Sequence, residues 1–333
     1  MSAPSATDWR PTATRPVLAQ RAQLLARTRH FFARRAVLEV DTPVVVNCAV
    51  TDVHLHCAQV RFAERPERAY FLHTSPEYAM KRLLAAGSGD IYQICHVIRG
   101  FERGPHHNAE FTLIEWYRLG FSLDALMDEV EALVRDLLGK AAASLAGERI
   151  SYRELFMREL HFDPLTAQFP TLAEAARGIG FDVGAQDGAG QDAEQRDELL
   201  ELLMGARIGP KLGRDALTFV YGYPASQAAL ACLDPDDPRI ARRFELYCRG
   251  IELANGFQEL CCAAQQRARF QRDNAERRRR ALPDFAPDER LLAALESGLP
   301  ECSGVALGFD RLLMLASAAA HIDDVLPFST EQA

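Results

Sequence analysis

Residues 244–260 read FELYCRGIELANGFQEL, a stretch that fits either two strands or one helix. The β-forming residues Phe, Tyr and Ile favour strands, and Arg249-Gly250 fits a two-residue hairpin turn. In such a hairpin Tyr247 pairs with Glu252, and Glu245 lies on the same face as Tyr247. The alternative is an amphipathic helix, because the seven-residue spacing of the two glutamates also equals two helical turns. We favour the hairpin.

The two glutamates of this hairpin predict a metal site. Carboxylates that point to one face from neighbouring strands repel each other unless a cation lies between them. Mg²⁺ binds proteins through one or two carboxylates together with substrate phosphates. Glu245 and Glu252 therefore predict a magnesium site that also holds phosphate groups.

Working outward from the hairpin, strands and helices follow one another in both directions. Runs of strands with helices around them predict an α+β fold, in which a mostly antiparallel sheet is flanked by helices. The expected helices cover residues 17–32, 124–138, 193–204 and 265–280, and one begins at Asp310; the expected strands cover residues 37–40, 92–99, 110–118, 218–223 and 304–308.

The domain organisation follows from composition along the 333 residues. Residues 1–15 lack periodicity and are expected to form a loose N-terminal arm. Residues 16–333 are expected to form one folded domain. Within it, glycines interrupt residues 170–214, which we interpret as a surface insertion.

Bulk properties exclude several classes of protein. No apolar run approaches the ~20 residues that span a bilayer, and no secretory leader is evident, so we expect a cytoplasmic protein that does not bind membranes. The net charge of −8 argues against a broad nucleic-acid surface. The eight cysteines show no zinc spacing, so we expect reduced, buried thiols, including the adjacent Cys261 and Cys262.

A polar loop connects the two expected strands at residues 92–99 and 110–118. Alternation along the second strand puts Phe111, Glu115 and Tyr117 on one face. With Arg99 and His107 in the loop, this face suits a pocket for a small polar molecule, and the guanidinium would clamp a phosphate or carboxylate. The alternative is an exposed sheet face with surface charges.

Two helix starts carry further candidates. Arg311, in the first turn after GVALGF, opposes the helix dipole, which favours an anionic partner there. Residues 74–77, TSPE, are typical of a helix start. Glu77 is then either an ordinary first-turn acid or the receiver of a substrate ammonium. The basic run 277–280 is either a solvated face or a surface for an acidic partner.

Taken in order, these segments resemble the signature motifs of class II aminoacyl-tRNA synthetases, in the lysyl-tRNA synthetase version. FFARRAVLEVDTP resembles the first motif, whose proline would be Pro43 and whose usual role is the dimer interface. Arg99 to Phe111 resembles the second motif, GVALGFDR resembles the third, and IELANGFQEL is similar to the lysyl-enzyme segment between them. The resemblance extends from about residue 17 to the end and implies a class II catalytic domain and a homodimer.

A lysyl-tRNA synthetase also carries an N-terminal OB-fold that reads the anticodon, whereas only some 15 residues precede the first-motif helix here. TSPEY, LIEWYR, YPASQAALA and Ala306 resemble a short paralogous group that attaches (R)-β-lysine to a lysine of translation elongation factor P. Ala306 stands where the tRNA enzymes usually have glycine, a difference associated with a β-amino acid. The resemblance thus implies β-lysine or lysine as substrate and elongation factor P as acceptor, and it disfavours tRNA.

The reaction implied by the resemblance is attack of the amino-acid carboxylate on ATP, followed by acyl transfer from the adenylate to a lysine amine. ATP and Mg²⁺ would be the cofactors, with Arg99 and Arg311 catalytic and Glu245 and Glu252 holding the metal. The implied ATP-binding residues are Arg99, Glu102, His107, Asn108, Phe111, Glu245, Leu246, Gly308 and Arg311. The implied amino-acid-binding residues are Ser75, Pro76, Glu77, Tyr117, Glu252, Asn255, Glu259 and Ala306.

The second motif departs from the family pattern, because Phe101 occupies the usual glutamate position and Glu102 follows it. Either Glu102 reads the adenine from a shifted loop or a backbone group does so. Three other functions stay open: a truncated synthetase that charges tRNA, a ligase of the asparagine-synthetase type, and a non-catalytic regulatory paralogue. The presence of Arg99, Glu245, Glu252 and Arg311 speaks against the last.

Overall fold

A computed structural model describes residues 9–100, 103–183 and 193–333. The chain forms two compact units. Unit 1 comprises Met1–Phe121, Ala132–Ala142 and Cys261–Ala333, and unit 2 comprises Ser122–Glu131 and Ala143–Leu260. Helix α3 (Leu123–Leu138) contributes residues to both.

The strands of unit 1 pair mostly antiparallel. The order is β1-β5-β6-β11, where β1 runs parallel to β5 and the pairs β5–β6 and β6–β11 are antiparallel. A smaller antiparallel sheet has the order β2-β4-β3. The strands are β1 (Leu38–Glu39), β2 (Val45–Val46), β3 (Gln59–Val60), β4 (Tyr70–Leu72), β5 (Ile91–Ile98), β6 (Glu110–Leu119) and β11 (Cys302–Gly308). The predicted hairpin of residues 92–99 and 110–118 is thereby confirmed.

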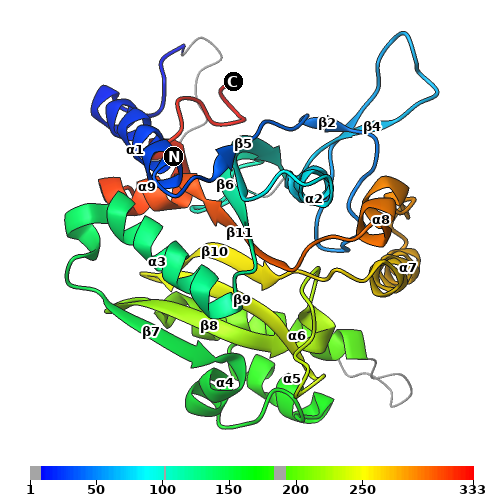
Figure 1. Ribbon diagram of the computed structural model, residues 1–333. Coiled ribbons are helices and arrows are strands. Elements are labelled where there is room, and N and C mark those ends of the chain that lie inside the picture. Colours follow the sequence, from blue (N-terminus) through cyan, green and yellow to red (C-terminus); the bar gives the residue numbers. More distant parts are fainter. Residues whose placement is uncertain (1–8, 101–102, 184–192) are drawn as a thin grey trace. The chain divides into compact units, whose positions relative to one another are not determined.

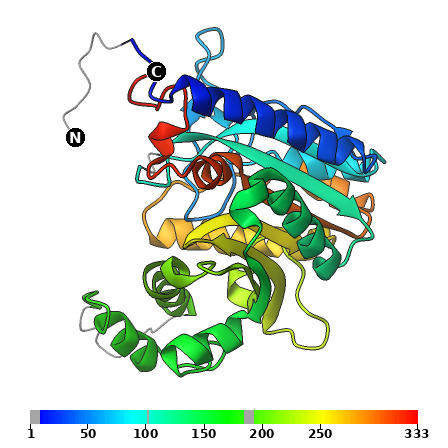
Figure 2. The same ribbon diagram turned by 90° about the vertical axis from the view of Figure 1, so that its left-hand side faces the viewer.

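Helices α1 and α9 cover the β5–β6 pair of unit 1 and lie side by side in both ribbon views (Figures 1 and 2). From α1, Phe32 stacks on Tyr92 of β5 at 4.3 Å between ring centroids and meets Trp116 of β6 edge-on at 5.3 Å. The helices of unit 1 are α1 (Arg15–Ala33), α2 (Glu77–Ala85), η1 (Gly139–Ala142), α7 (Ala263–Arg279), α8 (Glu289–Glu296), α9 (Phe309–Ser317) and η5 (Ile322–Asp324).

The four strands of unit 2 have the order β10-β9-β8-β7, and only the β7–β8 pair is parallel. Helices α4, α5 and α6 lie on one side of β8 and β9 (Figure 1). The elements are β7 (Ala146–Ser151), α4 (Tyr152–Leu160), α5 (Phe169–Arg177), α6 (Ala193–Leu203), η2 (Met204–Ile208), η3 (Gly209–Lys211), β8 (Ala216–Pro224), η4 (Ala225–Gln227), β9 (Ile240–Cys248) and β10 (Ile251–Gln258). With helices flanking mostly antiparallel strands, the predicted α+β fold is confirmed.

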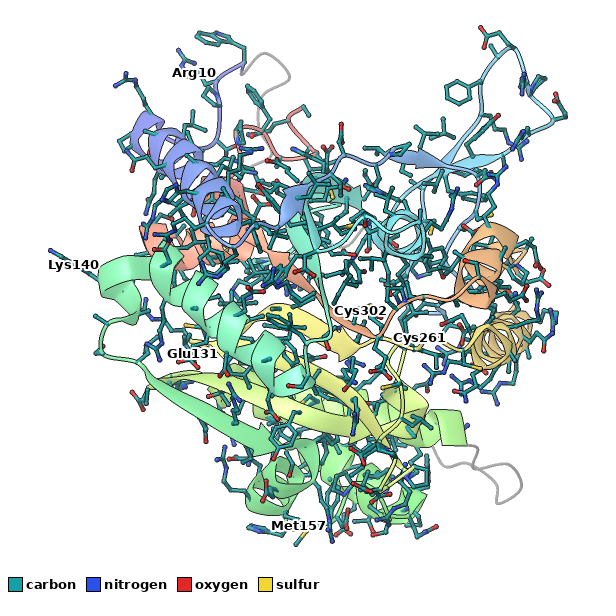
Figure 3. The ribbon with its side chains drawn as sticks, in the orientation of Figure 1. Arg10, Glu131, Lys140, Met157, Cys261 and Cys302 are labelled. Atoms are coloured by element: carbon teal, nitrogen blue, oxygen red, sulfur yellow. The ribbon has the colours of Figure 1, made fainter. Side chains whose placement is uncertain are left out.

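The core of unit 2 includes part of the segment that the sequence presents as a surface insertion. Leu172, Ala176, Leu200 and Leu203 are buried together with Tyr152 of α4 and its neighbours. Their packing against α4 makes this segment part of the core of unit 2. Met157, at the outer side of α4, is 47% exposed instead (Figure 3).

The β9–β10 hairpin forms as the sequence predicts. Tyr247 pairs with Glu252, and the turn residues Arg249 and Gly250 have φ values of 51° and 78°. Two positive φ angles are typical of a type I′ turn, which matches the twist of the strands. A Cβ on Gly250 would lie 2.7 Å from the carbonyl oxygen of Pro210, so glycine is required there on two grounds. The helical alternative for residues 244–260 is wrong.

Two other sequence interpretations meet different outcomes. All eight cysteines are free, as expected, but only Cys95, Cys248 and Cys302 are buried. Cys261 is half-buried and Cys262, the N-cap of α7, is exposed, so the prediction that both adjacent cysteines are core thiols is wrong. The basic run at the end of α7 is bound within unit 1. Arg277 is 2% exposed and donates to Pro283 and Asp52 carbonyls, Arg278 pairs with Asp284, and Arg279 and Arg280 pair with Glu276. Among the described residues, no helix is long and apolar enough to span a membrane.

Candidate functional site

Glu115 is the centre of a buried polar cluster in unit 1. Its side chain projects from β6 and is 2% exposed. Ser75 Oγ donates to Glu115 Oε2 at 2.7 Å, and Tyr117 OH donates to Glu115 Oε1 at 2.8 Å. Ser75 Oγ also accepts from the backbone N–H of Glu77 at 3.0 Å, which ties the start of α2 to the cluster. The predicted residues Ser75, Glu77 and Tyr117 are thus brought together.

The electrostatics of this cluster favour a cationic ligand. Burial, followed by the negative charge of Glu77, raises the pKa of Glu115 to about 7. The hydrogen bonds from Ser75 and Tyr117 and the charge of Arg99 oppose this rise only in part. A carboxylate has four lone-pair positions, and two remain on Glu115 after these bonds. An ammonium group would fill them and relieve the repulsion between the carboxylates.

Glu77 already has one cationic partner within the protein. Lys81 Nζ donates to Glu77 Oε1 at 2.7 Å, one helical turn away on α2, and the Lys81 side chain is only 2% exposed. The other two lysines differ: Lys140 projects from the surface in Figure 3, and Lys211 forms an exposed pair with Glu159. Glu77 is therefore a paired carboxylate that can share its second oxygen with a ligand.

Pro76 and Ala306 frame the same cluster. Pro76 precedes α2 as its N-cap residue and thus sets the direction of Glu77. Ala306 of β11 pairs directly with Glu115 of β6, so their side chains lie on one face of the sheet. The half-buried methyl group of Ala306 packs beside Leu113 and Phe111. One methyl therefore limits the space next to the buried carboxylate.

Arg99 and Phe111 form a second pair of predicted residues in unit 1. The Arg99 guanidinium lies 5.2 Å from the centroid of the Phe111 ring, and its Nε donates to the Thr74 carbonyl at 3.2 Å. Phe111 is half-buried at the start of β6. A flat aromatic ring next to a positive charge suits a ligand that combines a planar group with an anion.

Arg311 meets the loop that carries His107. Arg311 Nε donates to the His106 carbonyl at 3.2 Å, and Arg311 Nη2 donates to His107 Nε2 at 2.6 Å. Burial, and then the charge of Arg311, lowers the pKa of His107 to about 4. The imidazole is therefore neutral near pH 7 and can accept this hydrogen bond. The loop fixes the guanidinium in the first turn of α9, as the sequence prediction of an anion site requires.

The remaining predicted residues of unit 1 either make contacts within the protein or lie outside the described residues. Asn108 is buried; its Oδ1 accepts from Arg103 at 2.9 Å and its Nδ2 donates to the Glu110 carbonyl at 2.7 Å. Its amide thus closes the loop. Gly308 is the N-cap of α9, where a Cβ would lie 3.6 Å from the Arg311 side chain. Glu102 lies outside the described residues.

In unit 2, Glu245 is the most constrained of the predicted residues. It is 7% exposed and accepts from Tyr223 OH and Tyr247 OH, each at 2.6 Å, on Oε2. Arg243 Nη2 donates to Oε1. Three donors from β8 and β9 thus hold one carboxylate, and one of its four lone-pair positions remains.

The neighbouring strand brings Asn255, and not Glu252, opposite Glu245. A β-bulge between Glu252 and Ala254 shifts the register, so that Glu252 faces Tyr247 and Asn255 faces Glu245. In an unbroken ladder Ala254 would take that place. Bulges re-aim side chains in this way. Both Glu252 and Asn255 are half-buried and lie on the face of Glu245.

Two further predicted residues of unit 2 lie in the core. Leu246 is fully buried and pairs with Ala254, so its side chain points to the opposite face from Glu245. Any contact of Leu246 with a ligand on that face would have to involve its backbone. Glu259 is 4% exposed and forms a β-bridge with Ala231 just beyond β10.

Open volume borders the unit 2 residues. A cavity of about 220 Å³ is lined by Tyr223, Arg243, Glu245 and Tyr247 together with Gln227 and residues of α6 and η2. The Nε2 atom of Gln227 is buried in the wall without a hydrogen-bond partner. The face of β9 that carries Glu245 is therefore accessible to a small polar ligand.

The carboxylates of unit 2 fit a magnesium ion that is held jointly with phosphate. Across the part of the chain that the structure describes, no group of three or more His, Cys, Asp and Glu could hold a metal by itself. Mg²⁺ in nucleotide enzymes needs only one or two carboxylates, because phosphates and water complete its shell. The open position on Glu245 and the half-buried Glu252 satisfy that requirement.

Several residues of these sites escape prediction from sequence. Alternation places Glu115 on the face of Phe111 and Tyr117, but that pattern gives it no role of its own. Lys81 carries no signal beyond its place one turn after Glu77. Arg243 and Tyr223 can be found only once the strands are aligned.

Comparisons with known proteins identify the family of the chain. Residues 4–332 match the family described as tRNA synthetases class II (D, K and N). A protein of Vibrio cholerae named elongation factor P–(R)-β-lysine ligase is 50% identical over 325 residues, covering 97% of this chain and 98% of the relative. Proteins of the same name from Pectobacterium atrosepticum (98% and 99% coverage) and Vibrio vulnificus (96% and 98%) are 47% and 48% identical.

Proposed function

Because the chain belongs to the class II tRNA synthetase family of the D, K and N enzymes, we propose that it is an ATP-dependent ligase. It activates (R)-β-lysine, or lysine, and transfers it to a lysine side chain of translation elongation factor P. Relatives that match it over nearly their whole length carry the corresponding name, which favours a protein acceptor over tRNA. The structural observation that carries the proposal is the buried carboxylate of Glu115, which suits the ammonium group of such a substrate.

The amino-acid substrate binds through its amines to the Glu115 cluster. Ser75 and Tyr117 hold the Glu115 carboxylate in place, and Glu77 adds a second negative charge. Ala306 restricts the space beside Glu115 and so acts on the choice between α- and β-amino acid. Taken by itself, unit 2 offers Asn255 and Glu259 as polar side chains suited to an amino-acid ligand.

ATP binds through the arginines and aromatic residues of unit 1. Phe111 stacks on the adenine, Arg99 holds the α-phosphate and Arg311 holds the outer phosphates. The contact between Arg311 and neutral His107 supports this role, because it fixes the guanidinium without neutralising it. Asn108 acts through the loop that its amide closes.

Glu245 and Glu252 hold Mg²⁺, which neutralises phosphate charge when it is bound. The substrate carboxylate is already ionised, so the protein needs no general base for adenylate formation. Its contribution is to position the reactants and to place positive charge where negative charge develops.

We also propose that the protein is a cytoplasmic homodimer. The acceptor is a translation factor, which supports the location. The segment from β1 to β2 supports the dimer, because Leu38, Val44 and Val45 are large apolar side chains with exposures of 55%, 37% and 38%. Apolar groups on one exposed segment are typical of an interaction surface.

ATP–pyrophosphate exchange tests the proposal. We expect exchange to depend on β-lysine or lysine and not on aspartate, which distinguishes a ligase of the asparagine-synthetase type. Elongation factor P should then accept the labelled amino acid, whereas tRNA should not. Exchange without transfer to elongation factor P, or transfer to tRNA, would overturn the proposed acceptor. No exchange with any amino acid would overturn the ligase itself.

A further inference from the structure

Arg243 connects two of the candidate site residues of unit 2. Its Nη2 donates to Glu245 Oε1, and its Nε donates to Asn255 Oδ1 at 3.2 Å. Its Nη1 donates to the Gln227 carbonyl at 2.8 Å, and its guanidinium lies 4.5 Å from the centroid of the Tyr223 ring. The three nitrogens of one rigid group therefore reach acceptors on β9, β10 and η4.

The contact with Asn255 determines how the amide is presented. A guanidinium has only donors, so the atom of Asn255 that faces it must be the carbonyl oxygen. This assignment follows from the chemistry and does not depend on distinguishing nitrogen from oxygen by position. The Nδ2 group of Asn255 then has its two N–H donors directed away from Arg243. Such a donor pair suits a carboxylate.

The contact with Glu245 fixes an acceptor beside that donor. Tyr223 and Tyr247 occupy both positions on Oε2, and Arg243 occupies one position on Oε1. A guanidinium cannot be deprotonated in proteins. The guanidinium therefore stays charged next to the carboxylate at all physiological pH values.

These contacts border open volume and are not enclosed in the core. Arg243, Glu245, Tyr223 and Tyr247 line the cavity of about 220 Å³ in unit 2. The Arg243 side chain is 16% exposed and that of Glu245 is 10% exposed. The β-bulge of β10 is what places Asn255 on this face. A network of this kind holds a surface ready for a ligand before the ligand arrives.

We propose that Arg243 is a positioning residue that presents the Asn255 amide to the carboxylate of the amino-acid substrate and fixes Glu245 beside it. This inference rests on the proposed function, in which Asn255 and Glu245 belong to the site. Arg243 itself touches neither substrate nor metal. It acts by fixing which polar atoms face the ligand.

The variant Arg243→Lys tests whether Arg243 acts by positioning its partners or only by its positive charge. An ammonium keeps the positive charge but offers its donors from one atom, so it cannot hold acceptors on three elements. The matched control is Arg242→Lys, because Arg242 is the adjacent residue on β9 and contacts Asp234 and Gln258 instead. Both variants are made in the full chain, and thermal unfolding identifies any loss of fold.

The decisive measurement is a double-mutant cycle on β-lysine affinity, determined by calorimetry. We expect Arg243→Lys and Asn255→Ala each to weaken binding about tenfold, and Arg242→Lys to change it less than twofold. If Arg243 acts through Asn255, the double variant should bind no more weakly than Asn255→Ala alone. Additive losses, or no loss in Arg243→Lys, would refute the positioning role.

A second ligand distinguishes the positioning role of Arg243 from a purely structural one. Pentane-1,4-diamine is β-lysine without its carboxylate, and we expect its affinity to be the same in the wild type and in Arg243→Lys. An equal loss for both ligands would mean that the substitution damages the whole site and would refute the inference. If the wild type binds neither β-lysine nor lysine, the proposed function fails instead, so the two failures are distinguishable.

Discussion

The carboxylates of Glu77 and Glu115 repel each other inside unit 1, and this repulsion is the main cause, after burial, that raises the pKa of Glu115 to about 7. A bound ammonium favours the ionised form, so binding of the substrate must release a proton when Glu115 starts protonated. We expect β-lysine to bind more tightly as the pH rises towards 7, by up to about tenfold per unit below that pH. Calorimetry between pH 5.5 and 8 measures this slope.

Glu115→Gln is the control for the pH dependence. It should bind β-lysine roughly tenfold to a hundredfold more weakly, because a charged hydrogen bond is lost, and the slope below pH 7 should disappear. The same pKa shift affects stability. Because the folded state holds the proton more tightly, the contribution of Glu115 to stability falls as the pH rises from 4.5 to about 7. If the pH dependence of β-lysine binding persisted in Glu115→Gln, Glu115 would not be the group that binds the ammonium.

Lys81→Met should destabilise the protein strongly. The substitution removes the cation that donates to Glu77 inside unit 1 and leaves a carboxylate without this partner. Breaking a buried ion pair from one side costs about 3–5 kcal/mol. Urea unfolding measures the change, and Lys140→Met is the matched control because Lys140 is exposed. Equal urea midpoints for Lys81→Met and Lys140→Met would show that the pair of Lys81 and Glu77 contributes little to stability.

Arg311→Ala should lower the rate of ATP–pyrophosphate exchange by roughly 10²–10³, which is typical for loss of one preorganised donor at a developing charge. Arg278→Ala serves as the control, since Arg278 lies at the end of α7 and forms an exposed pair with Asp284. An Arg311→Ala protein with normal exchange would remove Arg311 from the proposed mechanism.

Ala306→Gly should shift the preference between amino acids. Removal of the methyl group beside Glu115 opens space that α-lysine requires, and one methyl or methylene is worth about tenfold or more in selectivity. The measurement is the ratio of kcat/KM for β-lysine to that for α-lysine in pyrophosphate exchange. The ratio corrects for any loss of active protein, and an unchanged ratio would show that Ala306 does not select the substrate.

The elements of the fold could be predicted from sequence because their signals are local. The β9–β10 hairpin follows from β-forming residues and from Arg249-Gly250, whose positive φ angles fit the turn. The extent of the core could not be predicted in the same way. The glycines in residues 170–214 indicate a surface insertion, whereas Leu172 and Leu200 pack into the core of unit 2. Tertiary burial outweighed composition there.

Side chains of the candidate sites could be predicted from sequence where they lie in a motif. The residues that hold those side chains in place could not. Ser75 and Tyr117 come from short sequence patterns, and alternation places Glu115 on the face of Tyr117, but the role of Glu115 in joining them becomes evident only from two hydrogen bonds. Arg243 lies in no motif, because its contacts involve three elements that are distant in sequence. Partners of this kind depend on register, which hydrophobic patterns do not report.

The bulge in β10 changes which side chains of the strand point to each face of the sheet. Before the bulge the even-numbered Glu252 lies on the face of Glu245, and after it the odd-numbered Asn255 and Phe257 lie on that face. If the strand kept all its residues in a regular ladder, Ala254 would lie opposite Glu245, and Asn255 and every later side chain of the strand would turn to the other face. The bulge is therefore what lets Glu252 and Asn255, which are three residues apart, share the face of Glu245. A change that straightened β10 without removing a residue would have to rebuild this face from different side chains.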